Sequence, residues 1–268
     1  MTRLAHYRVT AFNTSWESDN KIHDDAVARR LGFAGGLVPG VDVYAYMAHA
    51  PVARWGREWL ERGTIEARFT KPVYDGAETV VSATLEGDVM NLAVESGGLT
   101  CAVGTAGINV DRPATRLDDF PRVEVPAPLP PASPESLAAG VALGAIDDEP
   151  ARGGQADYLK DVREDQAIYA DAGLAHPGYL LRRANVALRE NVTLGPWIHV
   201  ESKVWNIRAL SVDEPFTTRA VVLDNYEKNG HLFVDLDVVI AARDRDPVCR
   251  VRHKAIYVPR QLRETTET

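Results

Sequence analysis

The pattern of apolar and polar residues in the N-terminal half changes from helical to strand-like at Gly63. Residues 41–50 are apolar on nearly all sides, which predicts a helix that is buried on most of its faces, with a kink or a new helical turn at Pro51. Residues 6–13 alternate like a strand, and residues 24–32 have the spacing of a short amphipathic helix. Further strands are expected at residues 64–71, 77–87, 89–95 and 99–110, with turn residues between them. This order is typical of an α+β protein.

The same order of elements recurs in the C-terminal half. Residues 22–33 align with residues 163–174, and Pro39-Gly40 aligns with Pro177-Gly178 after a three-residue deletion. Asn229-Gly230 indicates a tight hairpin. A helix is expected over residues 179–191, followed by strands over residues 199–207, 216–227, 231–243 and 248–258. The internal duplication predicts two units, each with one helix wrapped by an antiparallel sheet.

A proline-rich segment separates the two repeats. Six prolines between residues 121 and 134 predict an extended, semi-rigid linker. We therefore expect an N-terminal unit over residues 1–120 that carries the candidate active site, a linker over 121–135, and a C-terminal unit over 136–268.

Composition and charge narrow the range of partners. The chain has 268 residues, of which 45% are hydrophobic and 25% charged, as in ordinary globular proteins. The formal net charge of −8 speaks against a nucleic-acid partner. The basic pairs Arg29-Arg30 and Arg182-Arg183 are expected on solvated helix faces, or against an anionic cofactor. The sequence has no phosphate loop and no dinucleotide fingerprint.

The location of the protein is predicted from its apolar runs and its cysteines. No apolar run approaches the length of a membrane span and no signal peptide is visible, so we expect no membrane association. Cys101 and Cys249 are far apart in the sequence, which fits a reducing, cytoplasmic environment, and no metal site is expected.

Two short stretches carry the candidate chemistry. His23 lies among acids and an amide just before a helical run, and histidine can transfer protons near neutral pH. Pro39-Gly40 begins the apolar helix, and the free N–H groups at a helix start can bind a carbonyl oxygen or an oxyanion. A base and an oxyanion site are the minimum for chemistry next to a thioester carbonyl.

On these residues the sequence resembles the MaoC-like (R)-specific enoyl-CoA hydratases and dehydratases of the hotdog superfamily, in their double-hotdog, single-chain form. The family motif reads Gly-Asp-x-Asn-Pro-Leu-His, and Asn20-Lys21-Ile22-His23 matches its end. The resemblance implies an α+β fold with two hotdog units, each a central helix wrapped by a curved antiparallel sheet. It also implies that His23 is the histidine of the catalytic dyad, that Asn20 is the motif asparagine, and that the N–H of Gly40 polarises the thioester carbonyl.

The sequence departs from the motif at the acid of the dyad. The family has Asp five positions before the histidine, where this chain has Ser18. Asp19 is the first candidate for a catalytic partner of His23, and Ser18 or Glu17 are the alternatives. Ser18 and Val41 are expected to join Gly40 in substrate binding. The second repeat has Glu164 in place of His23, so we expect one active site per chain.

The resemblance implies that the protein adds or removes water at the 2,3-position of an acyl thioester. The thioester carrier is CoA or an acyl-carrier protein, so CoA or phosphopantetheine belongs to the substrate and no separate cofactor is expected. The alternatives are a hotdog acyl-CoA thioesterase and a non-catalytic acyl-binding subunit. His49 and His176 are expected to be structural, and we expect pairing of two chains into a homodimer through sheet edges or helices.

Overall fold

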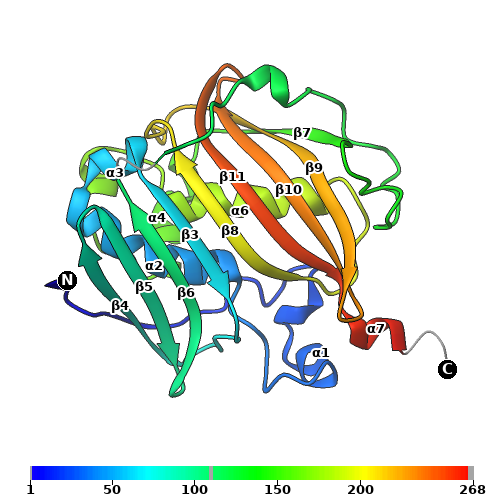
Figure 1. Cartoon of the computed structure of the whole chain (residues 1–268), viewed down its shortest axis with the longest axis horizontal. Coiled ribbons are helices and arrows are strands. Elements are labelled where there is room, and N and C mark those ends of the chain that lie inside the picture. The colour runs from blue at the N-terminus through cyan, green and yellow to red at the C-terminus, as the bar shows by residue number, and fades with distance from the viewer. Residues whose placement is uncertain (1, 109–110, 265–268) are drawn as a thin grey trace.

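A single curved antiparallel sheet encloses two helices in the computed structural model, which describes residues 2–108 and 111–264 (Figure 1). The strand order is β1-β4-β5-β6-β3-β8-β11-β10-β9-β7, and β2 pairs with β4 beside this path. The N-terminal strands are β1 (Thr2–Arg3), β2 (Tyr7–Thr10), β3 (Thr64–Phe69), β4 (Glu78–Glu86), β5 (Val89–Ser96) and β6 (Leu99–Gly107). The C-terminal strands are β7 (Ala142–Asp148), β8 (Ile198–Asn206), β9 (Phe216–Lys228), β10 (His231–Ala242) and β11 (Asp246–Val258).

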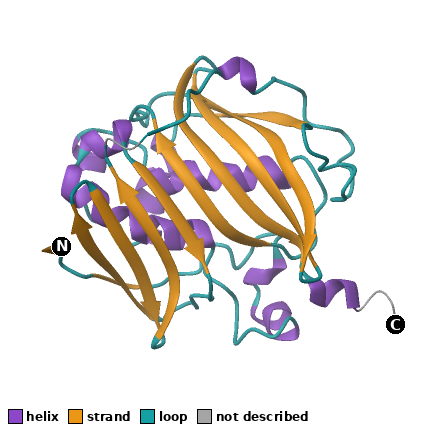
Figure 2. Ribbon diagram, viewed as in Figure 1, coloured by secondary structure: helices purple, strands orange, loops and turns teal. Residues whose placement is uncertain are grey.

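The long helices lie on one face of this sheet, and α1 (Asp25–Arg30) and α7 (Arg260–Glu264) lie beyond the ends of its strands (Figure 2). The other helices are α2 (Gly40–Trp55), α3 (Arg57–Arg62), α4 (Arg152–Asp161), α5 (Ile168–Asp171) and α6 (Pro177–Arg189), with short 3-10 helices η1 (Lys21–His23) and η2 (Leu117–Asp119). The long helices α2 and α6 contact each other and are each covered by the strands of their own half. The structure therefore has the two helix-and-sheet units that the duplication predicts.

The two units share one sheet because β3 pairs with β8. The pairing is antiparallel and runs from Thr64 opposite Trp205 to Arg68 opposite Glu201. Backbone hydrogen bonds thus cross from one half to the other, and Gly40 at the start of α2 lies against His199 at the start of β8.

Helix α2 is the central element of the N-terminal core. Tyr44, Met47 and Val52 are all almost completely buried, as the apolar pattern predicts. The helix continues through Pro51 to Trp55, beyond the end expected at residue 50. Burial of this segment against the sheet outweighs the one backbone hydrogen bond that a proline removes.

Most expected elements are confirmed, with small shifts at their ends. The Asn229-Gly230 turn joins β9 and β10, and both residues have positive φ, at 53° and 80°, as a type I′ turn requires. The expected strand over residues 99–110 ends at Gly107, and residues 109–110 lie outside the described residues. The edge strand β7 was not expected, because its sequence lacks a clear alternation.

The proline-rich segment packs along the C-terminal unit. Val123 accepts a hydrogen bond from Ala145 at the start of this unit, and Pro130 accepts one from Thr193. The segment is therefore fastened at two points. No helix among the described residues is long and apolar enough to cross a membrane. Both cysteines are buried and free of disulfide bonds.

Candidate active site

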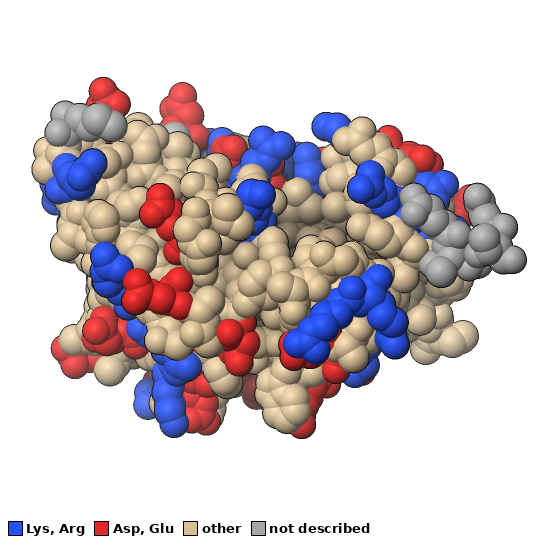
Figure 3. All heavy atoms as spheres, turned by 90° about the horizontal axis from the view of Figure 1, so that it is seen from below, with Lys and Arg blue, Asp and Glu red and all other residues tan. Residues whose placement is uncertain are grey.

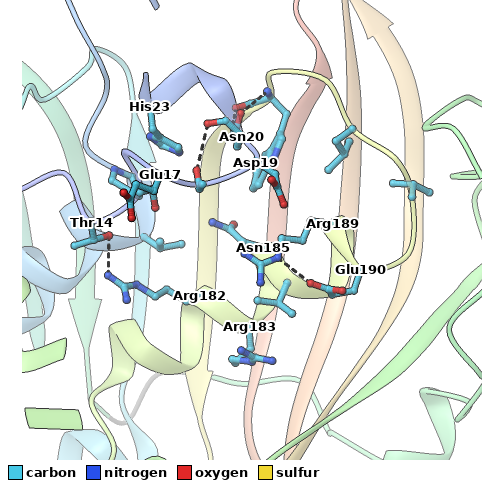
Figure 4. Close-up of a pocket in the computed structure, with 18 of the residues that line it drawn as sticks. Thr14, Glu17, Asp19, Asn20, His23, Arg182, Arg183, Asn185, Arg189 and Glu190 are labelled. Atoms are coloured by element: carbon cyan, nitrogen blue, oxygen red, sulfur yellow. Dashed lines mark hydrogen bonds and ion pairs between the residues drawn. The ribbon is translucent and has the colours of Figure 1, made fainter. Parts of the chain in front are cut away.

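Two adjoining cavities lie where the two halves meet. The larger has a volume of about 730 Å³ and the smaller about 310 Å³. The residues that line both cavities come from the loop before α1, the start of α2, the middle of α6 and the start of β8, and they are Asn20, His23, Pro39, Asn185 and Trp197. Figure 4 shows side chains of the larger cavity. Residues from both repeats are thus needed to build one site.

His23 is held at this junction by its ring and by its backbone. Its Nδ1 lies 2.6 Å from the carbonyl oxygen of Leu37, and since a carbonyl only accepts, Nδ1 carries the proton. Nε2 of the neutral ring then keeps its lone pair. A Cβ on Gly36 would overlap the His23 carbonyl oxygen, so a glycine is required for this close approach. Asn13 donates to the same carbonyl at 2.9 Å.

The surroundings of His23 keep its ring neutral. Burial lowers the pKa of His23 below its ordinary value, while the Leu37 carbonyl and the charge of Asp42 act in the opposite direction. A neutral imidazole with a free Nε2 is able to accept a proton at neutral pH. The sequence prediction of His23 as the base is compatible with this geometry.

Asp42, a buried acid whose charge acts on His23, was not identified by the sequence analysis. It lies in the first turn of α2 with no exposed surface, and Thr14 donates to its Oδ2 at 2.6 Å. Arg182 of α6 donates to its Oδ1 from Nε at 3.0 Å and from Nη2 at 2.7 Å. The signal in the sequence was a charged residue within an otherwise apolar helical run, because a buried charge needs a partner.

The expectation of solvated helix faces for Arg182-Arg183 is therefore wrong. The side chain of Arg182 is 29% exposed and that of Arg183 only 16%. The guanidinium of Arg182 also lies over the ring of Tyr158, and Arg183 pairs with Asp148 at 2.5 Å. These arginines connect α6 to Asp42 of α2 and Asp148 of β7. The apolar stripe of α6 in the sequence did not indicate these ion pairs.

Asn20 has a structural role in this geometry. Its Oδ1 accepts from the backbone N–H of Trp197 at 3.1 Å, and its Nδ2 donates to the carbonyl of Trp197 at 3.0 Å. The same Oδ1 caps η1 through the N–H of Ile22. The amide thus ties the His23 loop to the C-terminal half, and the catalytic role of Asn20 stays a prediction.

The acidic partners predicted for His23 line the larger cavity but do not reach the histidine. In the part of the chain that the structure describes, Asp19, Glu17 and Ser18 form no hydrogen bond or ion pair with His23. Figure 4 shows Asp19 pointing away from it. The hydroxyl of Ser18 donates instead to the carbonyl of Asn20 at 3.3 Å. The Leu37 carbonyl, which sequence analysis did not identify, takes the place of an acid in orienting the ring.

The predicted substrate-binding residues lie at the start of α2. Gly40 lines the smaller cavity and Val41 the larger. A Cβ on Gly40 would lie 2.8 Å from Nδ1 of His199, so glycine allows β8 to pack closely against the helix start. The first N–H groups of α2 have no partner within the helix and carry its positive dipole end.

His199 belongs to a buried polar chain behind the helix start. Its Nε2 lies 2.8 Å from the hydroxyl of Ser202, which lies 2.9 Å from Nδ1 of His253. Burial holds the pKa of His199 well below its usual value and lowers that of His253 to about 3. Both rings are therefore neutral at neutral pH and fix the wall against which Gly40 packs.

The two cavities differ in chemical character. The smaller one is lined by apolar residues of η1, α2 and both halves of the sheet, including Ile22, Phe33, Leu37, Val43, Phe69, Val73, Ile198 and Ile256. The larger one has charged walls, with Glu17, Asp19, Arg182, Arg183, Arg189 and Glu190. The molecule seen from below has acidic and basic side chains interspersed around a central recess (Figure 3). The smaller cavity therefore offers a more apolar surface and the larger a more charged one.

The corresponding position in the second repeat holds Glu164 between two histidines. Glu164 accepts from Nδ1 of His49 at 3.0 Å, and Nε2 of His176 lies 3.5 Å from its other oxygen. Burial acts to raise the pKa of Glu164, but the hydrogen bonds and charges of the two histidines outweigh it and hold this pKa far below the usual range. Gly178 donates to Nδ1 of His176, so Nε2 carries the proton and faces Glu164 as a donor. The structural roles predicted for both histidines fit these contacts.

A metal ion has little to bind at this position. His49, Glu164 and Asp165 bring one ligand atom each within 4.8 Å of one another. The Glu164 carboxylate, however, already accepts from the backbone N–H groups of Asp165 and Gln166 as well as from the histidines. Its Oε1 is therefore engaged as an acceptor, and its Oε2 faces Nε2 of His176.

Comparisons with known proteins identify the fold. Rv0216 from Mycobacterium tuberculosis, described as a double-hotdog protein, superposes with a TM-score of 0.64 at 12% identity, over 94% of this chain and 95% of its own. The chain has a double-hotdog fold. A candidate MaoC domain dehydratase from Chloroflexus aurantiacus has a TM-score of 0.61 at 10% identity, over 96% and 95% of the two chains. A candidate thioesterase from Novosphingobium aromaticivorans has 0.54 at 11%, over 95% and 96%.

The sequence itself matches no protein-family model, and no curated protein sequence matches it. The structural matches are full-length at low identity, so they establish the double-hotdog fold and leave the chemistry to the residues of the site. In this double hotdog, the cavity at the start of α2 contains His23, and its counterpart at the start of α6 contains the Glu164 ion pair.

Proposed function

We propose that the protein is a hydratase or dehydratase that adds or removes water at the 2,3-position of an acyl thioester. The observation that supports this most directly is the hydrogen bond from His23 Nδ1 to the Leu37 carbonyl. It leaves Nε2 of a partly buried, neutral imidazole as a base where the apolar and polar cavities adjoin. The start of α2 lies beside it.

The proposed reaction uses His23 twice. Nε2 takes a proton from water as the water oxygen forms a bond to the β-carbon of a 2-enoyl thioester. The electron pair of the C2–C3 double bond moves onto the thioester carbonyl, where the first N–H groups of α2 at Gly40 and Val41 stabilise the negative charge. His23 then returns the proton to the α-carbon. The reverse sequence removes water from a 3-hydroxyacyl thioester.

The two cavities suggest where each part of the substrate binds. The acyl chain occupies the apolar smaller cavity, and the carrier, CoA or phosphopantetheine, passes through the larger one. The carrier comes with the substrate, so the reaction as proposed requires only side chains and backbone groups of this chain.

The test is the loss of the enoyl-thioester absorbance with crotonyl-CoA as substrate. Wild type is expected to consume the band, whereas His23→Ala and His23→Gln lose most turnover, by about 10²-fold or more. His6→Ala changes an exposed histidine and is the matched control, with activity like wild type. Full activity in His23→Ala, with its folded state verified by circular dichroism, would refute the role of His23.

A thioesterase is the second candidate. It is favoured by the lack of a carboxylate bound to His23 in the described part of the chain, and by the fold shared with a candidate thioesterase. Release of free thiol from an acyl-CoA, measured with a thiol reagent, would identify it. Binding of acyl-CoA without either reaction would identify a non-catalytic acyl-binding subunit.

A further inference from the structure

We infer that Asn185 is a second catalytic residue of this site, whose side-chain amide holds the water molecule that His23 deprotonates. The inference rests on the proposed hydratase reaction. Asn185 was not identified from the sequence, where it lies in the predicted helix over residues 179–191 with no motif around it.

The position of Asn185 places it opposite the base. It is one of the residues that line both cavities, together with His23. It comes from α6 of the C-terminal half, whereas His23 comes from the loop of the N-terminal half. Figure 4 shows the Asn185 amide pointing from α6 into the space below the loop that carries His23. A small molecule between the two cavities therefore meets both side chains.

The amide of Asn185 has no partner among the described residues. Its Oδ1 is buried and forms no hydrogen bond there. Leaving such a group unpaired costs about 1–3 kcal/mol, so it is normally satisfied or exposed to a ligand. Asn191, in the loop just after α6, shows the contrast: its Oδ1 accepts from Gly144, and its Nδ2 donates to Gly144 and Ala187. Asn185 thus offers hydrogen-bonding capacity that the protein itself does not use.

The internal duplication allows Asn185 to be compared with the residue at the equivalent position of the other long helix. Counted from the Pro-Gly pair that begins each helix, Asn185 of α6 occupies the position of Met47 in α2. Met47 is fully buried in the core. The site with His23 therefore faces an amide, whereas the repeat with Glu164 has a thioether at the equivalent helix position. The polar residue is present only opposite the base.

The chemistry needs a second acceptor for the attacking water. One O–H of the water points to Nε2 of His23, and the other must point elsewhere for a lone pair to face the β-carbon. No carboxylate contacts His23 in the described part of the chain, and the Oδ1 of Asn185 supplies this acceptor. An amide does not take the proton itself, so Asn185 orients the water and His23 alone transfers the proton.

The experiment compares Asn185→Ala and Asn185→Asp with wild type in the crotonyl-CoA assay. Asn185→Ala is expected to lower kcat by about 10- to 100-fold and to leave KM within about threefold, because only the water loses its orientation. Asn185→Asp keeps an acceptor oxygen and is expected to retain more activity than Asn185→Ala, increasingly so as pH rises and the new carboxyl ionises. Asn91→Ala, the same change at an exposed strand position, is the control.

The outcomes separate this inference from the proposed function. If wild type consumes crotonyl-CoA and His23→Ala does not, but Asn185→Ala keeps the wild-type kcat, then only the inference on Asn185 is overturned. A rise in KM with unchanged kcat also overturns it, since the amide would then bind substrate. Wild type without hydration activity overturns both. If Asn185→Ala fails to fold, equal kcat values and pH profiles for Asn185→Asp and wild type would overturn the inference, and a changed profile would support it.

Discussion

Asp42 on α2 and Arg182 on α6 form an ion pair between the two central helices, with 2.7 Å between Oδ1 and Nη2. The carboxylate is fully buried and also accepts from Thr14, while the arginine remains partly exposed. The pair joins the two repeats next to the site, and the charge of Asp42 acts on His23. Removal of one partner leaves a buried charge without compensation, which is costly.

The first prediction concerns this pair. Arg182→Met is expected to lower the free energy of unfolding by about 3 kcal/mol, because Asp42 stays buried without its counter-charge. The double variant Asp42→Asn/Arg182→Met should recover part of this loss, since the buried charge is then absent. Urea unfolding measures both. The exposed pair of Arg8 and Glu78 is the control, where Glu78→Gln should change stability by less than about 1 kcal/mol. Additive effects at Asp42 and Arg182 would contradict the coupling.

The second prediction is the pH dependence of the reaction. Burial lowers the pKa of His23, so the base stays unprotonated below its ordinary pKa. For hydration of crotonyl-CoA, kcat/KM should fall on the acid side only at a pH below about 6.5, and should be level near neutral pH. A pH–rate profile of kcat/KM measures this. An acid limb centred above pH 7 would show that His23 is not the free-enzyme base.

The third prediction concerns Glu164 of the second repeat. Glu164→Gln is expected to destabilise the protein by about 2 kcal/mol, because the charge-assisted hydrogen bond from His49 and the electrostatic contact of His176 with the carboxylate are lost. The loss should shrink on acidification: a carboxylate whose pKa is lowered by folding stabilises fully above its unfolded pKa, and this stabilisation is lost as pH falls through the folded pKa. Thermal unfolding of both proteins from pH 7 to pH 3 tests this. Specific activity of the folded variant should match wild type, and a large loss would contradict a single active site per chain.

The fourth prediction concerns the start of α2. Gly40→Ala places a Cβ against the ring of His199 and should cost about 1–3 kcal/mol in stability and most of the activity, because the first helical turn must shift. Gly153→Ala in α4 is the control: no atom lies within 4 Å of its new Cβ, and the change should be neutral or stabilising by up to about 1 kcal/mol. Wild-type activity and stability in Gly40→Ala would show that the contact with His199 is not restrictive.

The sequence by itself determined the repeated arrangement and singled out His23 as the proposed base. The apolar run after Pro39-Gly40, the alternating strands and the second Pro-Gly pair predict two helix-and-sheet units, because the spacing of apolar residues reports which face of an element is buried. The stretch that ends at His23 is short and local, so its resemblance to a family motif was visible in the sequence. The exchange of His23 for Glu164 was visible in the same way.

The tertiary structure alone decided which side chains meet at the site. Asp42 and Arg182 are 140 residues apart in the sequence, and Asn20 binds Trp197 across 177 residues. Periodicity shows that a residue faces inward but not which residue of a distant element lies opposite. Sequence analysis therefore placed Asp19 beside His23 because the two are close along the chain. In the folded protein Asp19 points away from His23, and Asn20 binds the backbone of Trp197. Asn185, from the other repeat, lines the same cavity as the histidine.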